Sequence, residues 1–368
     1  MAVVVVENSS VAILLPSLSS GDAIGNDVLE EFKLLRKKGI DVYLYAEHYE
    51  PQFAPLMASV DRVKRAGVII YHHGIEWLTG EKILNQHAGS YRILRYHNVT
   101  PPQFFAGYSA ELEKLVKRGR EQTRRLTKLC THFFADSQYN CKELINEGAP
   151  LDKCWVVAPF HQADELLSLQ ADIRTLESLL ADSRPIILFV GRQVPNKGLH
   201  HFVRVARSLL DLCGAKFRFI WVGNRDPRLA KYYREVESYL AVNRLFDLVI
   251  FPGKASQTEL KAFYLAASVF LTLSEHEGFC VPIVEAQALG VPVVALGRAA
   301  VPETAGENQL VFEELDYERF AAAVAVLLAN PDYRLHLASH GRNNYHRRFA
   351  RQVLEAAFLG ALGGVYSS

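Results

Sequence analysis

The sequence predicts an α/β protein with two Rossmann-like units. At 368 residues the chain is long enough for two hydrophobic cores of ordinary size. Short apolar segments rich in Val, Ile, Leu and Phe alternate with longer segments of helical period, which is typical of a parallel sheet with crossover helices. The alternation starts again at residue 185, so each half of the chain predicts its own doubly wound sheet.

The first half contains the expected elements in order. Residues 11–16 and 40–46 predict strands on either side of an amphipathic helix over 26–39, which ends at Gly39. Three further segments, GVIIYHH, YRILRYH and THFFADS, predict the remaining strands of this sheet.

The second half repeats the pattern, with strands expected at PIILFVG, FRFIWVG, DLVIFPG, VFLTLS and VPVVAL. The polar segment 161–184 between the halves is the best candidate for a linker. We therefore expect domains over 1–165 and 166–345. Residues 346–368 are left as a C-terminal helix that could pack back on the first domain.

The composition excludes several classes of protein. The 41 basic residues nearly balance the 40 acidic ones, which argues against nucleic acid as the main partner. No apolar stretch reaches the roughly 18 residues of a membrane span, and the N-terminal segment lacks the basic region of a signal peptide. The five cysteines are scattered and form no C-x-x-C pair, so a reducing cytoplasm and no zinc site are expected.

The strongest local signal is EGFCVPIVE, in which Glu277 and Glu285 flank seven residues after a predicted strand. Pro282 suits the first helical position, which predicts Glu277 on the loop and Glu285 in the first turn of a helix. Carboxylates accept hydrogen bonds from vicinal hydroxyls, and free amides at a helix start suit a phosphate. The alternative is that Glu285 merely complements the helix dipole and Glu277 is a solvated loop residue.

A second signal is GRQVPNKG, in which Gly191 and Arg192 end a predicted strand and Lys197 and Gly198 lead into a helix. Two cations at the carboxyl end of a strand, beside a helix N-terminus, could neutralise a diphosphate. Either cation alone is as well explained by a solvated surface position.

These motifs resemble retaining glycosyltransferase family 4, whose members have the GT-B fold. VGRQVPNKG, IWVGN, IFPG, EGFCVPIVE and GVPVVAL occur in the family's order over roughly residues 185–315. The resemblance implies a C-terminal nucleotide-sugar donor domain. It implies that Arg192 and Lys197 hold the donor diphosphate, that Glu285 binds the ribose, and that Gly223 lies against the nucleotide.

The same resemblance assigns the donor sugar and the base. It implies that Glu277, with the loop amides of Gly278 and Phe279, contacts the sugar. It implies that the backbone at Gly253 and Lys254 borders the base.

The first half carries less specific signals. Gly21 and Gly25, in GDAIGND, follow a Ser-rich loop and precede a helix, where backbone could approach a phosphate or an acceptor. A loop that merely needs flexible glycines is the alternative.

Polar residues follow three strands of the first half. By resemblance His97, in RYHNVTPP, corresponds to the family's cleft histidine and would touch the donor sugar or the reacting hydroxyl. His72 and His73 are weaker candidates. Ser137, in FFADSQYN, is either a cleft serine or a helix N-cap.

A basic segment runs from Lys114 to Lys128 with an apolar stripe beside it. Its cations are Lys114, Lys117, Arg118, Arg120, Arg124, Arg125 and Lys128, and its apolar residues are Leu112, Leu115, Val116, Leu126 and Leu129. Such a helix could rest on anionic lipid, which would put a cytoplasmic enzyme on the inner face of the membrane. A solvated helix packed on its own sheet is the alternative.

The expected reaction follows from the resemblance. The family implies transfer of a hexose with retention, here from GDP-mannose in preference to UDP donors, to a saccharide or lipid-linked oligosaccharide acceptor, as in the bacterial mannosyl- and hexosyltransferases. Because the chain has no D-x-D triplet, no metal and no cofactor are expected, and Arg192 and Lys197 would stabilise the leaving group.

Three other functions compete with transfer. A sugar-nucleotide epimerase and a non-catalytic sugar-nucleotide-binding protein could share the fold. An NAD-dependent dehydrogenase is disfavoured because neither half has the G-x-G-x-x-G fingerprint at its first strand.

Overall fold

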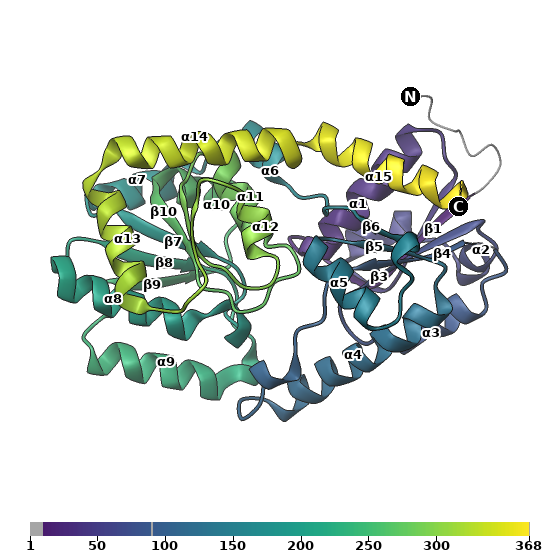
Figure 1. The fold of residues 1–368 in the computed structure, drawn as a ribbon, viewed down its shortest axis with the longest axis horizontal. Coiled ribbons are helices and arrows are strands. Elements are labelled where there is room, and N and C mark those ends of the chain that lie inside the picture. Colours follow the sequence, from purple (N-terminus) through teal and green to yellow (C-terminus); the bar gives the residue numbers. More distant parts are fainter. Residues whose placement is uncertain (1–9, 90, 368) are drawn as a thin grey trace. The chain divides into compact units, whose positions relative to one another are not determined.

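Two six-stranded parallel sheets form the framework of the chain in the computed structural model, which describes residues 10–89 and 91–367 (Figure 1). Each sheet is the centre of one compact unit. The predicted α/β class with two Rossmann-like sheets is confirmed.

The first sheet has the strand order β2-β1-β3-β4-β5-β6. Its strands are β1 (Val11–Leu18), β2 (Val42–Tyr49), β3 (Val68–His73), β4 (Tyr91–Tyr96), β5 (His132–Ala135) and β6 (Cys154–Val156). The helices between them are α1 (Ala23–Lys37), α2 (Val60–Lys64), α3 (Leu78–Asn85), α4 (Ala110–Leu129) and α5 (Gln138–Asn146). The order reverses between β1 and β3, and ligands of such sheets bind at the carboxyl strand ends beside this switch point.

The second sheet has the order β12-β11-β10-β7-β8-β9, with its switch point between β7 and β10. Its strands are β7 (Ile186–Val190), β8 (Arg218–Val222), β9 (Val249–Gly253), β10 (Ala267–Thr272), β11 (Val293–Leu296) and β12 (Leu310–Phe312). Its helices are α6 (Ala163–Ser168), α7 (Ile173–Ala181), α8 (Leu199–Cys213), α9 (Ala230–Val242), α10 (Gln257–Ala266), α11 (Val281–Ala288), α12 (Val301–Ala305), α13 (Tyr317–Ala329) and α14 (Pro331–Arg348).

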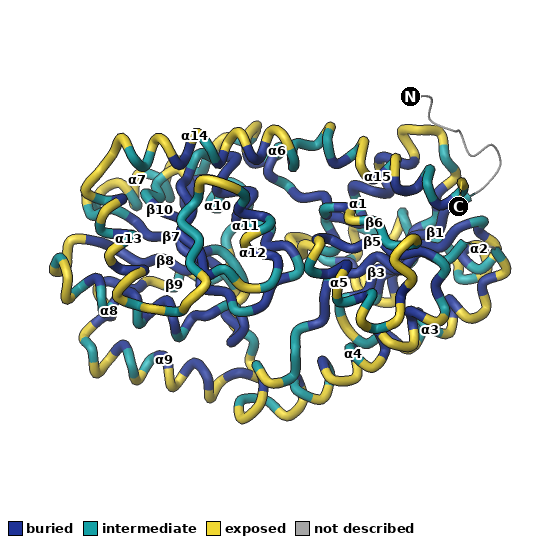
Figure 2. The backbone as a smooth tube through the Cα atoms, in the orientation of Figure 1, coloured by how far each residue is buried: buried dark blue, intermediate teal, exposed yellow. Residues whose placement is uncertain are grey.

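Both cores are built from the inner strands, which are buried along most of their length, whereas the edge strands β2, β6, β9 and β12 are more exposed and many helices are buried on one side only (Figure 2). In the second unit the ring of Trp221 lies 3.9 Å from that of Phe189 and 5.3 Å from that of Phe202, measured between centroids. Aromatic packing therefore joins β7, β8 and α8 in one core.

The division of the chain differs from the predicted one. The first unit holds the described residues up to 102, 114–161 and 351 onward, and the second holds 103–113 and 162–350. The predicted boundary at 165 falls inside α6, which packs on α10 and α11 of the second unit. Lys261 Nζ donates to the carbonyl of Leu167 at 2.9 Å, so the expected linker is a structured part of the second unit.

Two segments belong to a different unit from the residues next to them in the sequence. Residues 103–113 belong to the second unit, and the described residues from 351 onward belong to the first. Tyr108 packs edge-on against Tyr232 of the second unit, with 5.1 Å between the ring centroids. The last helix, α15 (Arg351–Tyr366), packs on the first unit through Phe358, whose ring lies 6.3 Å from that of Phe134 and 5.9 Å from that of Phe160.

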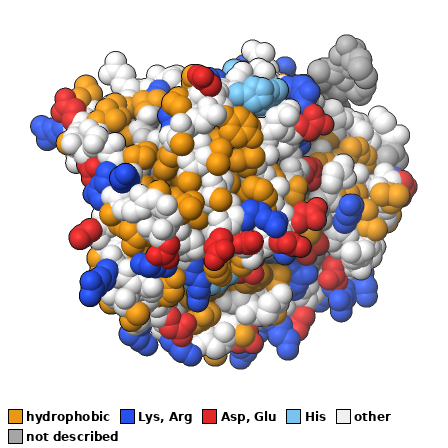
Figure 3. Space-filling view, turned by 60° about the vertical axis from the view of Figure 1, so that its left-hand side comes forward, with side chains coloured by type: hydrophobic (Ala, Val, Ile, Leu, Met, Phe, Trp, Pro, Cys, Tyr) orange, Lys and Arg blue, Asp and Glu red, His pale blue; other side chains and the backbone are white. Residues whose placement is uncertain are grey.

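The surface shows no large region of one charge in the view of Figure 3, where basic and acidic side chains are interspersed. No helix in the described part of the chain is both long enough and apolar enough to cross a membrane.

Close packing of backbone at the ends of β7 and β8 requires glycine. Gly223 has a φ of +152°, and a Cβ there would lie 1.9 Å from the carbonyl oxygen of Gly191. The adjacent strands approach so closely at this point that a side chain has no space.

We expect Gly223→Ala to lower the free energy of unfolding of the second unit by about 3 kcal/mol or more, because the backbone itself must move. Gly214→Ala is the control, since Gly214 also has a positive φ, +71°, but has no atom within 4 Å of its added Cβ. Its cost should be about 1–2 kcal/mol. Urea unfolding of both variants measures the difference, and equal losses would contradict the steric argument.

Candidate functional site

A salt bridge joins two loops at the switch point of the second sheet. Lys197 lies in the turn after β7 and Glu277 in the loop after β10, and Lys197 Nζ is 2.6 Å from Glu277 Oε2. The Glu277 side chain is 6% exposed and that of Lys197 is 22% exposed. The two predicted site residues are therefore brought together, as partners of one another.

Backbone contacts hold the same two loops in register. The amide of Glu275 donates to the carbonyl of Asn196 at 2.9 Å, and Asn196 Nδ2 donates to the carbonyl of His276 at 3.2 Å. Gly198, with a φ of +77°, allows the close approach, because a Cβ there would lie 2.1 Å from the carbonyl oxygen of Leu273. The glycine of the NKG sequence thus sets the distance between the loops.

The loop after β10 ends in a sharp turn at Cys280, whose φ of +78° is unusual for a residue with a side chain. Phe279 is buried against Phe349, with 5.3 Å between the ring centroids, and Thr304 Oγ1 donates to its carbonyl at 2.5 Å. The Phe279 side chain is a core residue, so only its backbone is available for a ligand. Gly278 before it is partly exposed.

Glu285 lies deeper than the sequence predicts. The helix α11 begins at Val281, so Pro282 is its second residue, and Glu285 is past the first turn, which holds no acidic residue. Pro282 was expected to be the first residue of the helix, and Glu285 was expected in its first turn. Both positions were wrong by about one residue, because the helix already begins at Val281, directly after the turn at Cys280. Tyr264 Oη donates to Glu285 Oε2 at 2.7 Å, and burial raises the pKa of this carboxyl to about 7.

Arg192 takes no part in the salt bridge between Lys197 and Glu277. It is exposed and lines a shallow hollow with Asn224, Asp226 and Arg228. The hydrogen bond from Arg228, and to a lesser extent the charge of Arg192, holds the pKa of Asp226 below its usual value. Among the described residues, the Arg192 guanidinium has no hydrogen bond or ion pair, so its charge is available to an anion.

The remaining predicted donor residues lie at neighbouring strand ends. Gly191 and Gly223 pack against one another, and the amide of Gly223 donates to the carbonyl of Gly253 at 2.8 Å. Gly253 has a φ of +85° with open space around it, and Lys254 is exposed. These residues end or directly follow β7, β8 and β9, so they share the carboxyl edge of the sheet.

In the first unit the glycine-rich segment forms the start of α1. Asp22 is the N-cap and its Oδ2 accepts from the amide of Gly25 at 3.0 Å, so the helix begins at Ala23, earlier than residue 26. Gly21, with a φ of +79°, lies in the exposed loop before the cap. Ser137 is the N-cap of α5 and accepts from the amide of Asn140 at 3.1 Å, which is the second of its two predicted roles.

His97 is part of a buried charged network that the sequence did not predict. Its Nδ1 lies 2.9 Å from Asp136 Oδ2, and its Nε2 lies 2.8 Å from Nδ1 of His72. The Nε2 of His72 lies 3.1 Å from Glu31 Oε2. His97 and Asp136 are only 5% exposed, so the histidine faces protein on most sides.

Arg95 and Asp27 complete this network. Arg95 Nε donates to Asp27 Oδ2 at 3.0 Å, and Asp27 Oδ1 accepts from the amide of Phe160 at 2.6 Å. Two sequence signals could have indicated it. Arg95 stands inside an apolar strand, and Asp27 and Glu31 are spaced i, i+4 on one face of α1.

The environment shifts these groups in opposite directions. Burial opposes the charged form of His97, but Asp136 and Asp27 outweigh it and raise its pKa. Burial and the nearby His97 hold the pKa of His72 well below its usual value. Burial raises the pKa of Glu31 to about 7. The network therefore distinguishes two adjacent imidazoles, one favouring a proton and one excluding it.

The basic segment turns its apolar side inward. Leu112, Val116 and Leu126 are buried in α4, and Arg125 and Arg124 form ion pairs with Glu81 and Glu147 at 2.9 Å. The apolar stripe is therefore not free to enter a membrane. Contact with anionic lipid stays a prediction that depends on the exposed cations alone.

Comparison with known proteins finds a family to which the second unit is similar. Residues 175–344 match the family model described as Glycosyl transferases group 1. This match covers most of the second unit. By this relationship the chain is an enzyme of the transferase class, and the epimerase and the non-catalytic binding protein are not favoured.

Relatives extend the similarity to most of the chain. The chain is 26% identical over 337 residues to D-inositol 3-phosphate glycosyltransferase of Acidothermus cellulolyticus. The aligned region covers 87% of the chain and 71% of that relative. It is 32% identical over 131 residues to the GDP-mannose-dependent alpha-mannosyltransferase of Mycolicibacterium smegmatis, which covers 35% of the chain and 28% of that relative. The chain thus spans less than a third of the second protein.

Solved structures confirm the GT-B fold. Sucrose-phosphate synthase from Thermosynechococcus elongatus is similar with a TM-score of 0.76 and 17% identity, over 98% of this chain and 100% of that one. Anabaena HepE, solved with UDP and glucose, has a TM-score of 0.74 and 16% identity, over 96% and 99% of the two chains.

We expect Lys197→Met to destabilise the second unit, because it leaves the buried Glu277 carboxylate without its partner. The loss should be smaller than the roughly 3–5 kcal/mol of a fully buried pair, since Lys197 is partly exposed. Adding Glu277→Gln should restore most of the loss. Urea unfolding of the two single variants and the double variant measures this coupling. Additive losses would show that the salt bridge contributes nothing to stability.

Proposed function

We propose that the chain is a retaining glycosyltransferase of family 4 that transfers a hexose from a nucleotide-sugar, with GDP-mannose as the favoured donor. The salt bridge between Lys197 and Glu277 at the switch point of a group 1 domain is the observation that supports this best. The proposed acceptor is a saccharide or a lipid-linked oligosaccharide, as in glycan and exopolysaccharide biosynthesis. The exposed cations of α4 could hold the enzyme at a membrane that carries such an acceptor.

In the proposed mechanism the second unit stabilises the departing nucleoside diphosphate. Lys197 and Arg192 supply positive charge, and the start of α11 supplies the positive end of a helix dipole. The chain has no D-x-D triplet, so these groups take the part that a metal and carboxylates have elsewhere.

The acceptor enters, in this proposal, on the face from which the diphosphate leaves. The departing phosphate oxygen takes the proton of the acceptor hydroxyl as the new glycosidic bond forms on the same face, which retains configuration. Glu277 contacts the donor sugar, His97 contacts the sugar or the reacting hydroxyl, and no side chain is a covalent nucleophile. The charge of Lys197 is then shared between Glu277 and the diphosphate.

The base of the donor can be identified by thermal stabilisation, because a ligand that binds the native state raises its melting temperature. We expect GDP and GDP-mannose to raise the Tm more than UDP and UDP-glucose at equal concentration. The matches to mannosyltransferases favour this order, whereas the UDP complex of HepE is the precedent against it. A larger shift with the uridine ligands would overturn the choice of donor.

The two glutamates should fail differently when mutated. Glu285→Gln removes a charged acceptor for the ribose hydroxyls, a loss of about 1.5–3 kcal/mol, so nucleoside diphosphate should bind roughly ten- to a hundredfold more weakly. Glu277→Gln frees Lys197 and should bind the nucleotide as well as the wild type does, but with a lower kcat, because contacts to the sugar matter most as the bond lengthens. Calorimetry and turnover assays separate the two defects.

The pH dependence gives an internal control for Glu285. Its pKa of about 7 means that the carboxyl gains a proton as the pH falls from 8 to 6, so nucleotide affinity should fall over the same range. Glu285→Gln should lose this part of the dependence and keep only that of the phosphates. If instead Glu277→Gln abolishes nucleotide binding while Glu285→Gln leaves it unchanged, the assignment is reversed.

Transfer should not need a divalent metal. We expect the initial rate to be unchanged in excess EDTA, because protein cations are proposed to neutralise the leaving group. Loss of transfer that magnesium or manganese restores would contradict the proposed mechanism.

A further inference from the structure

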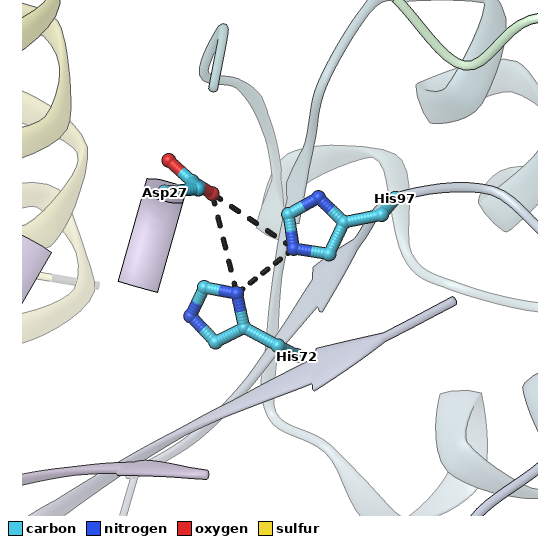
Figure 4. A group of neighbouring side chains, drawn as sticks. All are labelled: Asp27, His72 and His97. Atoms are coloured by element: carbon cyan, nitrogen blue, oxygen red, sulfur yellow. Dashed lines mark hydrogen bonds and ion pairs between the residues drawn. The ribbon is translucent and has the colours of Figure 1, made fainter. Parts of the chain in front are cut away.

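Three potential metal ligands meet at the carboxyl ends of the first sheet (Figure 4). Nδ1 of His72, at the end of β3, lies 2.8 Å from Nε2 of His97, which follows β4. Oδ2 of Asp27, on α1, lies 4.0 Å from the first nitrogen and 3.8 Å from the second. The three atoms converge on one point beside the switch point of the sheet.

The outer nitrogens of both histidines face carboxylates. Nε2 of His72 is 3.1 Å from Glu31 Oε2, and Nδ1 of His97 is 2.9 Å from Asp136 Oδ2. Metal-binding histidines are commonly oriented in this way, because an outer N–H bonded to a carboxylate leaves the inner nitrogen as a lone pair. In the metal-free protein the two inner nitrogens, 2.8 Å apart, share one hydrogen bond, and a cation bound between them would take the place of that proton.

The formal charge of the cluster is compatible with a bound divalent cation. Asp27, Glu31 and Asp136 contribute three negative charges, and Arg95 contributes one positive charge through Asp27 at 3.0 Å and Glu31 at 3.4 Å. In the metal-bound state both imidazoles must be neutral, so the side chains, which are 0–5% exposed, then sum to −2. Burying uncompensated charge is costly, and one divalent cation would bring the sum to zero.

We propose that Asp27, His72 and His97 form a binding site for a divalent transition metal, with Glu31 and Asp136 as positioning residues. Two imidazole nitrogens and one carboxylate oxygen suit zinc, which leaves a fourth position for water. Ligand atoms around tetrahedral zinc lie roughly 3.3 Å apart, so the two histidines must separate slightly and Asp27 must approach.

This site is distinct from the donor chemistry of the second unit. A bound metal uses Nε2 of His97, so metal occupancy and a hydrogen bond from that nitrogen to substrate exclude one another. The metal site therefore does not require the proposed transfer to be correct, and its test measures binding alone.

A second cluster serves as the control. His200, His201 and Glu275 also bring three potential ligand atoms together. Their outer nitrogens face the hydroxyls of Tyr232 and Tyr317, at 3.0 and 2.9 Å, and the cluster holds one carboxylate where the first holds three. We therefore assign the stronger site to the first unit.

The test is equilibrium dialysis of the chelator-stripped full-length protein with Zn²⁺, and with Co²⁺ for its visible ligand-field absorption. Incubation must be long, because the ligand side chains are almost fully buried and metal entry is slow. We expect one ion per chain, with affinity at least a hundredfold lower in His97→Gln and ten- to a hundredfold lower in Glu31→Gln. The double variant His200→Gln, His201→Gln should bind as the wild type does.

Circular dichroism of the metal-free variants shows whether they fold, and Asp136→Asn, at the more exposed side of the cluster, replaces His97→Gln if that variant does not. No stoichiometric binding by the wild type would overturn the proposal. So would binding that is lost in the His200, His201 variant and kept in His97→Gln.

Discussion

The arrangement of the second unit depends on the contact between the loops that follow β7 and β10. The salt bridge from Lys197 to Glu277 is its polar part, and the missing side chain at Gly198 is its steric part. The salt bridge depends on the glycine, since a Cβ at Gly198 would separate the loops and leave Glu277 buried without a counter-charge. The salt bridge and the backbone packing therefore both set the distance between these two loops.

The first unit also buries charged side chains, in a larger cluster. Three carboxylates, two imidazoles and a guanidinium lie together there, contributed by α1 and by the strand ends, and all are nearly inaccessible to water. Such a cluster is stable only if each charge is matched, so every member constrains the position of the others. Asp27 also accepts from the amide of Phe160, which ties the end of this unit to α1.

Elements governed by local patterns could be predicted from the sequence. The apolar strand segments, the helix around 199–212 and the N-cap alternative for Ser137 depend on neighbours within a few residues. The network around His97 could not be assembled in this way, because its members come from α1 and from three strand ends separated by up to 109 residues, from Asp27 to Asp136. The position of Glu285 was wrong for a local reason, the left-handed turn at Cys280.

Segment membership was harder to predict: the C-terminal helix was expected to be able to pack back on the first domain, but nothing in the pattern of residues 103–113 indicates that they join the second unit. The consequence reaches the order in which the chain folds during synthesis. The first unit needs α15, whose Phe358 covers Phe134 and Phe160, yet α15 is made only after the whole of the second unit. The second unit is contained within residues 103–350 and can finish first. The unit that leaves the ribosome earliest thus waits with part of its apolar surface uncovered, which gives chaperones a defined period in which to bind it.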